Sequence, residues 1–191
     1  MSKQTDLLNL TDAITANGTA LKVDTIQTAA GGVPTASDLG INVAGSVLQV
    51  VYGATTSGAV TTTSTSFVDS SVSLSITPSS STSKVLVNCN LHVYISQAAA
   101  SVWNAANFRI LRGGTQVFKT SGTPSSGYTL GALYVSTSDR FMAVVPLAYL
   151  DTPSSTAVTT YTIQLATKGT GQVQINAAYG YSTMTLQEIA G

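Results

Sequence analysis

The 191-residue sequence predicts an all-β protein folded as a sandwich or a barrel. Three observations lead to this fold class. Only 8% of the residues are charged, whereas 53 are Ser or Thr, so hydroxyl groups rather than charges hydrate the surface. Thr, Val and Ile suit pleated strands, while Ser, Gly and Pro suit turns. From Gly45 onward, short strand-like runs alternate with turn clusters, without the fixed repeat period of a solenoid or propeller.

Residues 1–44 are predicted to form an N-terminal attachment arm. They carry two Lys and four Asp, a net charge of −2, whereas residues 45–191 carry six basic and four acidic residues, a net charge of +2. Their apolar residues form two short clusters, LLNL and ALKVDTI, followed by the turn-rich segment AAGGVPTASDLG. Because this surface is too small to bury a core, we expect the arm to become ordered against a partner and residues 45–191 to form the β-domain.

The composition also argues against several kinds of partner. The formal net charge is +0, so the chain as a whole does not attract nucleic acid or an anionic membrane. No run reaches the ~18 apolar residues of a membrane helix, and the first residues lack the apolar core of a secretory signal. We therefore expect no nucleic-acid partner and no membrane partner.

The β-domain is predicted to contain about ten strands separated by turn clusters such as TPSSSTS, SGTPSSG and DTPSSTAV. Gly113-Gly114, between two of the strand-like runs, is predicted to be a two-residue hairpin turn. The predicted strands cover residues 46–52, 72–76, 84–95, 108–111, 115–119, 132–136, 140–150, 160–166, 172–178 and 183–189.

The only Cys and the only His, Cys89 and His92, lie three residues apart in the run 84–95. They would share a face in a helix, but the odd positions of this run are apolar and the even positions are mostly polar, which indicates a strand. Cys89 is therefore predicted to point into the core, and His92 to lie on the opposite face as a surface or inter-subunit hydrogen-bonding residue. An alternative is an ion held by three copies of His92 on a three-fold axis. The predicted core residues of this strand are Val85, Val87, Cys89, Leu91, Val93 and Ile95.

The residues needed for catalysis are scarce, and we predict that the protein is not an enzyme and has no catalytic residue, cofactor or metal. Nucleophilic catalysis needs a base beside the nucleophile, and the lone His faces away from the lone Cys. Glycoside hydrolysis needs two carboxylates in one cleft, and zinc needs several clustered ligands. A small hydrolase is therefore the least favoured function. The acidic residues of the β-domain are expected to serve turns at strand ends; they are Asp69, Asp139, Asp151 and Glu188.

The run RFMAVVPLAYL, residues 140–150, is apolar at both its odd and its even positions. Such a strand is buried between two layers, or a neighbouring subunit covers one of its faces. An exposed apolar face on a chain without net charge favours association, so we expect a closed assembly. Met142, Val144 and Leu150 are the predicted subunit interface.

Three aromatic residues lie in or near segments rich in turn residues: Trp103, Tyr128 and Tyr134. Aromatic rings in polar loops either anchor the loop or stack on sugars. These residues are therefore candidates for contact with a glycan.

Five phrases together resemble a module of bacteriophage tail fibres and other virion proteins, especially those of marine and cyanobacterial phages. They are GSVLQVVYG, TSFVDSSVSLSITPSSSTSKVLVNCNL, FRILRGGTQVF, LDTPSSTAVTTYTIQL and STMTLQEIAG. The resemblance covers residues 45–191, with variable segments at 97–107 and 119–139.

The resemblance implies a location in the virion and a structural role without catalytic residues, as a tail fibre or a capsid decoration component. It also implies an antiparallel β-sandwich of jelly-roll type that packs as a homotrimer. Residues 1–44 would then bind other phage capsid or tail proteins. The alternative is a host receptor-binding adhesin that recognises a surface glycan through loops 97–107 and 120–139.

Overall fold

The computed structural model describes residues 44–55, 58–96, 105–119, 140–168, 171–176 and 180–191. These residues form ten strands and no helix, and their strand pairings are all antiparallel. The prediction of an all-β protein is therefore confirmed. The strands are β1 Val47–Ala54, β2 Val60–Thr62, β3 Val68–Ile76, β4 Lys84–Ser96, β5 Ala105–Arg112, β6 Thr115–Lys119, β7 Arg140–Asp151, β8 Thr159–Lys168, β9 Gln172–Ile175 and β10 Thr183–Ile189.

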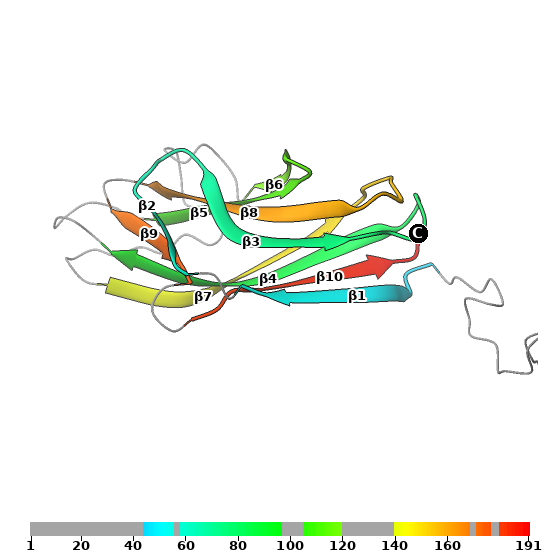
Figure 1. Ribbon diagram of the computed structural model, residues 1–191, viewed down its shortest axis with the longest axis horizontal. Helices are drawn as coiled ribbons and strands as arrows, with labels where there is room; N and C mark the ends of the chain where they lie inside the picture. The colour runs from blue at the N-terminus through cyan, green and yellow to red at the C-terminus, as the bar shows by residue number, and fades with distance from the viewer. Residues whose placement is uncertain (1–43, 56–57, 97–104, 120–139, 169–170, 177–179) are drawn as a thin grey trace, which may run out of the picture. The chain divides into compact units, whose positions relative to one another are not determined.

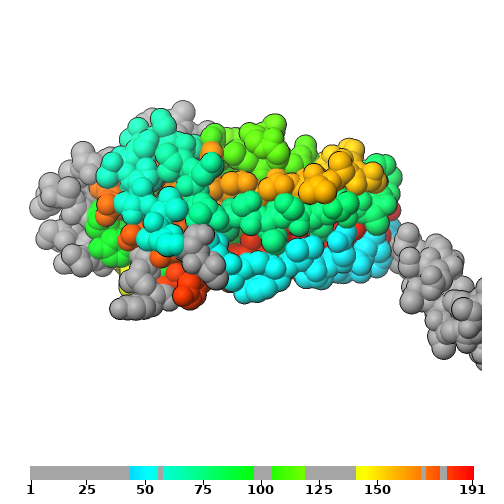
Figure 2. Space-filling view, viewed as in Figure 1, coloured from blue at the N-terminus to red at the C-terminus, as the bar shows by residue number. Residues whose placement is uncertain are grey.

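The strands form two sheets that lie one above the other (Figure 1). In the first sheet, β4 pairs with β7 along one side and with β10 and then β9 along the other, while β1 and β2 extend from β10 and β9. The second sheet has the order β3-β8-β5-β6. On one flank, the edge strands β1 and β3 lie side by side over the interior (Figure 2).

This strand order is that of a jelly roll. Apart from the short strands β2 and β9, the described part contains eight strands, in the orders β1-β10-β4-β7 and β3-β8-β5-β6. The first and last of the eight therefore pair with each other, and so do the second and the seventh. This nesting of outer pairs around inner pairs is the double Greek key of the jelly roll. The sandwich expected from the resemblance is confirmed, and the barrel is not formed.

The core lies between the two sheets, and β4 supplies one side of it. Its odd-numbered residues from Val85 to Ile95 are at most 2% exposed, whereas its even-numbered residues face outward and are half-buried or exposed. Phe108, Tyr161 and Leu165 of the second sheet are also fully buried. Burying one side chain of this size contributes about 1.5–3 kcal/mol, so this alternation explains why β4 keeps a single register.

Cys89 and His92 lie on opposite faces of β4, as the alternation predicts. Cys89 is buried among the apolar core side chains, and burial raises the pKa of its thiol to about 12. His92 is half-buried on the outer face, where it pairs in register with Val144 of β7. The two side chains therefore form no reactive pair.

Some strand limits differ from the predicted ones, for local reasons. Strand β2 is absent from the prediction because three residues carry too little pattern. Strand β3 begins at Val68, whereas the predicted strand begins at residue 72. The prediction missed the first part of β3 because a bulge with Ser71 at a φ of 63° interrupts the ladder, and the residues before the bulge show no regular alternation. Strand β9 ends at Ile175 because Asn176 has a φ of 57°, which turns the chain out of the sheet.

The hairpin turn at Gly113-Gly114 is confirmed. The two glycines have φ values of 52° and 86°, and they join β5 to β6 with Arg112 and Thr115 as the last pair. Positive φ at both central positions is typical of a type I′ turn, which glycine adopts without steric cost. The predicted strand at 132–136 and the predicted arm, apart from Ala44, lie outside the described residues.

Candidate functional site

Strand β7 carries a stripe of exposed apolar residues on the outer face of the first sheet. Met142, Val144 and Leu150 are 53%, 59% and 49% exposed, and Pro146 and Ala148 between them are exposed as well. These five residues are called the β7 stripe below. The alternate residues Val145 and Leu147 enter the core. Of the two explanations for a strand that is apolar on both faces, burial between two layers is therefore not observed within the described part of the chain.

The outer face of β4 continues the β7 stripe. The antiparallel register places Leu86 beside Leu150, His92 beside Val144 and Tyr94 beside Met142. Asn88 and Asn90 lie beside Ala148 and Pro146. Side chains directly opposite each other on one face of a sheet are in contact distance, so these pairs form a continuous surface.

The same surface extends across β10 to β1. Gln187 and Thr185 of β10 follow β4 at the same levels, and Val50 and Tyr52 of β1 lie beyond them and are exposed. Among the outward positions of these four strands whose side chains the structure describes, the charged residue is Lys84, which is exposed at one end of β4 beside Ile189. The face therefore has two apolar margins, a middle of amides and hydroxyls, and the ammonium group of Lys84 at one end.

Within the described residues, β7 is an edge strand that pairs only with β4. An edge strand presents N–H and C=O groups to which another strand can add. Pro146 lies near the middle of β7 and has no N–H, and proline in sheets occurs on edges with that position towards solvent. The free edge of β7 is thus a poor template for a further strand.

His92 is held by the segment that follows β9. Its backbone N–H donates to Ser182 Oγ at 2.9 Å, and its C=O accepts from Asn176 N at 3.0 Å. Gly180 packs on the imidazole so closely that a Cβ at this position would overlap the ring. The His92 Nδ1 atom is buried without a hydrogen-bond partner. This ring is a packed element of the outer face, and neither of its nitrogens is paired with a hydroxyl or thiol in the described part of the chain.

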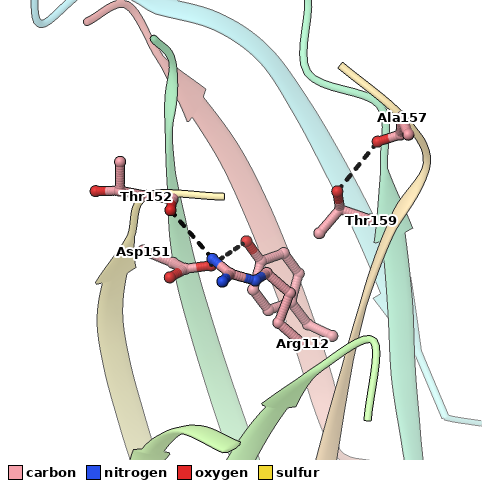
Figure 3. A network of polar contacts seen from close by, with 6 residues as sticks. Arg112, Asp151, Thr152, Ala157 and Thr159 are labelled. Atoms are coloured by element: carbon pink, nitrogen blue, oxygen red, sulfur yellow. Dashed lines mark hydrogen bonds and ion pairs between the residues drawn. The ribbon is translucent and has the colours of Figure 1, made fainter. Parts of the chain in front are cut away.

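A polar network closes one end of the sandwich (Figure 3). Arg112 Nη1 donates to Asp151 Oδ2 at 2.8 Å and to the Thr152 carbonyl at 3.1 Å. The buried Tyr161 hydroxyl donates to the same carboxylate oxygen at 2.8 Å. Burial and this bond to Asp151 raise the pKa of Tyr161. The network ties the ends of β5 and β7 to β8, so its chemistry is that of a structural clasp.

An open pocket of about 270 Å³ adjoins this clasp. Its lining is formed by Arg112, Gly113, Pro153, Ser155, Val158, Thr159 and Thr160. The Arg112 guanidinium is already engaged with Asp151, and the other lining groups are hydroxyls, backbone, Pro153 and the exposed Val158. Such a lining has no nucleophile with an adjacent base, and it contains no pair of carboxylates.

Two of the acidic residues that were expected to serve turns at strand ends are buried, Asp151 and Glu188. Glu188 does hold a turn: its Oε1 accepts from Ser79 N and Ser79 Oγ, both at 2.7 Å, while its Oε2 accepts from Gln49 Nε2 at 2.6 Å. Burial alone would raise the pKa of Glu188, but these hydrogen bonds outweigh it and lower the pKa. The alternation of Met184, Leu186 and Glu188 would have placed this carboxyl on the inner face.

The remaining predictions concern metal ions, membranes and glycans. The described residues contain no group of three His, Cys, Asp or Glu side chains that could hold a metal ion. Among the described residues, no helix is long and apolar enough to cross a membrane. Trp103, Tyr128 and Tyr134, the candidates for glycan contact, lie outside the described residues, as do most of loop 97–107 and loop 120–139.

No family model matches the sequence, and no protein of curated function matches it. Similar solved structures include T=1 particles derived from infectious bursal virus (TM-score 0.38, 9% identity, 76% of this chain and 37% of that chain). The T13 viral particle of the same virus has a TM-score of 0.38 and 12% identity over 74% of this chain and 36% of that chain. A VP2 subviral particle of infectious bursal disease virus has a TM-score of 0.36 and 10% identity over 76% and 39%. This chain spans less than two fifths of their length, and a likeness at this level does not identify a function.

Proposed function

We propose that the chain is a structural subunit of a bacteriophage particle, a fibre or decoration component that is not an enzyme. The observation that carries this proposal is the combination of a jelly-roll sandwich with a partly apolar outer face on β7, β4, β10 and β1 whose centre carries no charge. Jelly rolls recur in viral capsid and lectin domains, and a surface of this kind suits contacts between subunits. The sequence phrases that resemble phage virion modules point to the same role and to a homotrimer.

The chemistry of the described residues supports a structural role. Cys89 is buried and its thiol is held protonated, because burial raises its pKa to about 12. Asp151 and Glu188 are engaged in hydrogen bonds that fasten strands and a turn. In the described part of the chain, each of these groups therefore has a structural use, and none is placed as a nucleophile or a general base.

In this proposal, residues 1–44 attach the β-domain to other capsid or tail proteins of the particle. The charge of the arm differs in sign from that of the β-domain, and its two short apolar clusters suit binding in extended form to a partner surface. The β-domain then projects from the particle.

The experiment that tests this proposal is quantitative mass spectrometry of purified particles of the phage that encodes the chain, combined with a cryo-EM map. The full chain is expected in the particles at a fixed copy number, with density for a jelly roll. A chain that lacks residues 1–44 is expected to remain folded and soluble but to be missing from the particles. Absence of the full chain from purified particles would refute the structural role.

The second candidate function is a receptor-binding adhesin, which the jelly-roll topology also favours because lectin domains use it. Here loops 97–107 and 120–139, with Trp103, Tyr128 and Tyr134, would contact a surface glycan. A glycan array with the full chain separates the two functions. Binding that is lost in Trp103→Ala would favour the adhesin, whereas no binding on an array of host-surface glycans would favour the purely structural role.

A further inference from the structure

The outer face formed by β7, β4, β10 and β1 approaches the size of a specific protein interface. Strand β7 contains 12 residues, which at ~3.3 Å per residue gives a length of about 40 Å. The four strands β7, β4, β10 and β1, spaced ~4.8 Å apart, give a width of about 19 Å. Because β10 and β1 flank only Lys84–Asn90 of β4, about 23 Å, the face covers roughly 600 Å², about three quarters of the ~800 Å² that each partner contributes to a standard stable interface.

Its composition is that of an interface centre and favours a second copy of this chain as partner. Charged residues are depleted at the centre of interfaces, and the centre of this face contains no acidic residue, Lys or Arg, because Lys84 lies at its end. The centres of two such faces would therefore meet without repulsion between like charges. The apolar β7 stripe and the amides of Asn88 and Asn90 on β4 lie side by side, so the stripe of one copy can contact the β4 part of the face on the next copy, which is the heterologous contact that closes a ring.

The edge of β7 restricts how the copies meet. Because Pro146 interrupts the row of N–H donors, a neighbouring strand is a poor fit along this edge. The side chains of Met142, Val144 and Leu150 instead point away from the sheet plane and are exposed. Contact through these side chains requires packing on the face of the sheet.

From these observations we infer that copies of this chain associate through the outer face of β4 and β7, packed on the sheet face and not joined edge to edge. This inference rests on the proposed function, which includes a homotrimer, and it names the surface through which the three copies meet. Met142, Val144 and Leu150 lie at the contact. Leu86 and Tyr94 of β4 adjoin them in register and complete the apolar part of the contact.

The test is the mass of the full chain in solution, measured by light scattering coupled to size exclusion at micromolar concentration. The wild type is expected at about three times the 19.5 kDa chain mass, and Val144→Asp at a single chain mass. Val144 is 59% exposed in the protomer, so Val144→Asp is expected to keep the wild-type circular dichroism spectrum. The matched control is Val158→Asp, because Val158 is 70% exposed on the β7–β8 connection, and this variant is expected to keep the wild-type mass. A wild type of single chain mass, or an unchanged mass in Val144→Asp, would overturn the inference.

A photo-reactive residue identifies what covers the face, independently of any change in mass. Benzoylphenylalanine at position 144 is expected to give a cross-linked product of two chain masses, with cross-linked peptides from residues 84–96 or 140–151 of the second copy. The same group at position 158 is expected to give no such product. Cross-links from position 144 to residues 1–43 would overturn the inference in favour of the arm. The assembly and the proposed function fail separately: a trimer missing from purified particles refutes the function alone, and a monomer found in particles refutes this interface alone.

Discussion

The two sheets of this jelly roll share one core but differ on their outer faces. On the second sheet, polar side chains bind one another across all four strands. Gln164 Nε2 donates to Asp69 Oδ1 at 2.6 Å, Arg109 Nε donates to Gln164 Oε1 at 2.7 Å, and Arg109 Nη1 reaches Gln116 Oε1 at 3.3 Å. The Arg109 guanidinium also lies 4.5 Å from the centre of the Phe67 ring. The outer face of the second sheet is therefore formed by polar side chains that satisfy one another's hydrogen bonds.

The first sheet has the opposite arrangement. Its main carboxylate, Glu188, faces inward and is fully buried, while Met142, Val144 and Leu150 face outward. A charged ladder on the second sheet and an uncharged apolar margin on the first give the domain one face suited to water and one suited to a partner. The net charge of the chain is +0. The outer faces of the two sheets nevertheless differ in polarity, because Asp69 and Arg109 lie on the outer face of the second sheet whereas Glu188 of the first sheet points into the core.

The largest effect is expected from removing the inward carboxylate. In Glu188→Ala, the Gln49 amide and the Ser79 N–H and hydroxyl lose their acceptor in a buried site, which is expected to cost about 3 kcal/mol. The outward carboxylate provides the control: Asp69 is exposed, so Asp69→Ala is expected to change the free energy of unfolding by at most about 0.5 kcal/mol. Urea unfolding of the two variants measures the difference, and equal losses would contradict the contrast between the faces.

The same carboxylate gives the stability a pH dependence. The pKa of Glu188 is lower in the folded chain than the ordinary value of ~4.3, so its stabilising contribution is complete above ~4.3 and is lost as the pH falls through the lower folded value. Below about pH 4, the free energy of unfolding should fall more steeply in the wild type than in Glu188→Gln, which has no titrating group at this position. Parallel pH profiles of the two proteins would show that Glu188 does not titrate with folding.

A smaller effect is expected in the core that both faces share. Cys89 is 2% exposed, and Cys89→Ala leaves a small cavity, for which about 1 kcal/mol is expected, with assembly unchanged. With a pKa of about 12, only about 1 in 10,000 of its thiols is ionised at pH 8, so a thiol reagent should label the native protein far more slowly than the urea-unfolded chain. Rapid labelling of the native state would place Cys89 outside the core.

Much of this arrangement follows from local sequence pattern, because burial on one side of a strand imposes a period of two. The odd positions of β4 are apolar and buried, and the doubly apolar run 140–150 has one side in the core and one side exposed. The resemblance to phage modules also led to the jelly-roll sandwich. The alternation of β4 and the two apolar sides of residues 140–150 could be predicted because each depends only on the order of residues within one strand.

Other features depend on contacts between distant segments, and these escaped prediction. Strand β2 exists because Val60–Thr62 pairs with β9, more than a hundred residues later. The Ser71 bulge is supported by Ser70 Oγ, which donates to the Ile163 carbonyl at 2.7 Å. Glu188 is acceptable inside the protein only because Gln49 and Ser79 donate to it. In each case the partner, and not the local pattern, determines the structure.

The smallest change in the free energy of unfolding is expected from Pro146→Thr. This variant also tests whether copies of the chain meet through the sheet face or along the edge of β7. Pro146 is exposed and lies on an edge strand, so a β-branched residue there should change the free energy of unfolding by less than about 0.5 kcal/mol. The new N–H, however, completes the row of donors along β7 and makes the edge a better template for another strand. Species larger than the wild-type assembly should therefore appear in light scattering at high protein concentration, while Ala148→Thr, which alters the same face but not the backbone donors, should leave the mass distribution unchanged. If both variants behave like the wild type, Pro146 does not protect the edge, and the sheet face alone determines how the copies meet.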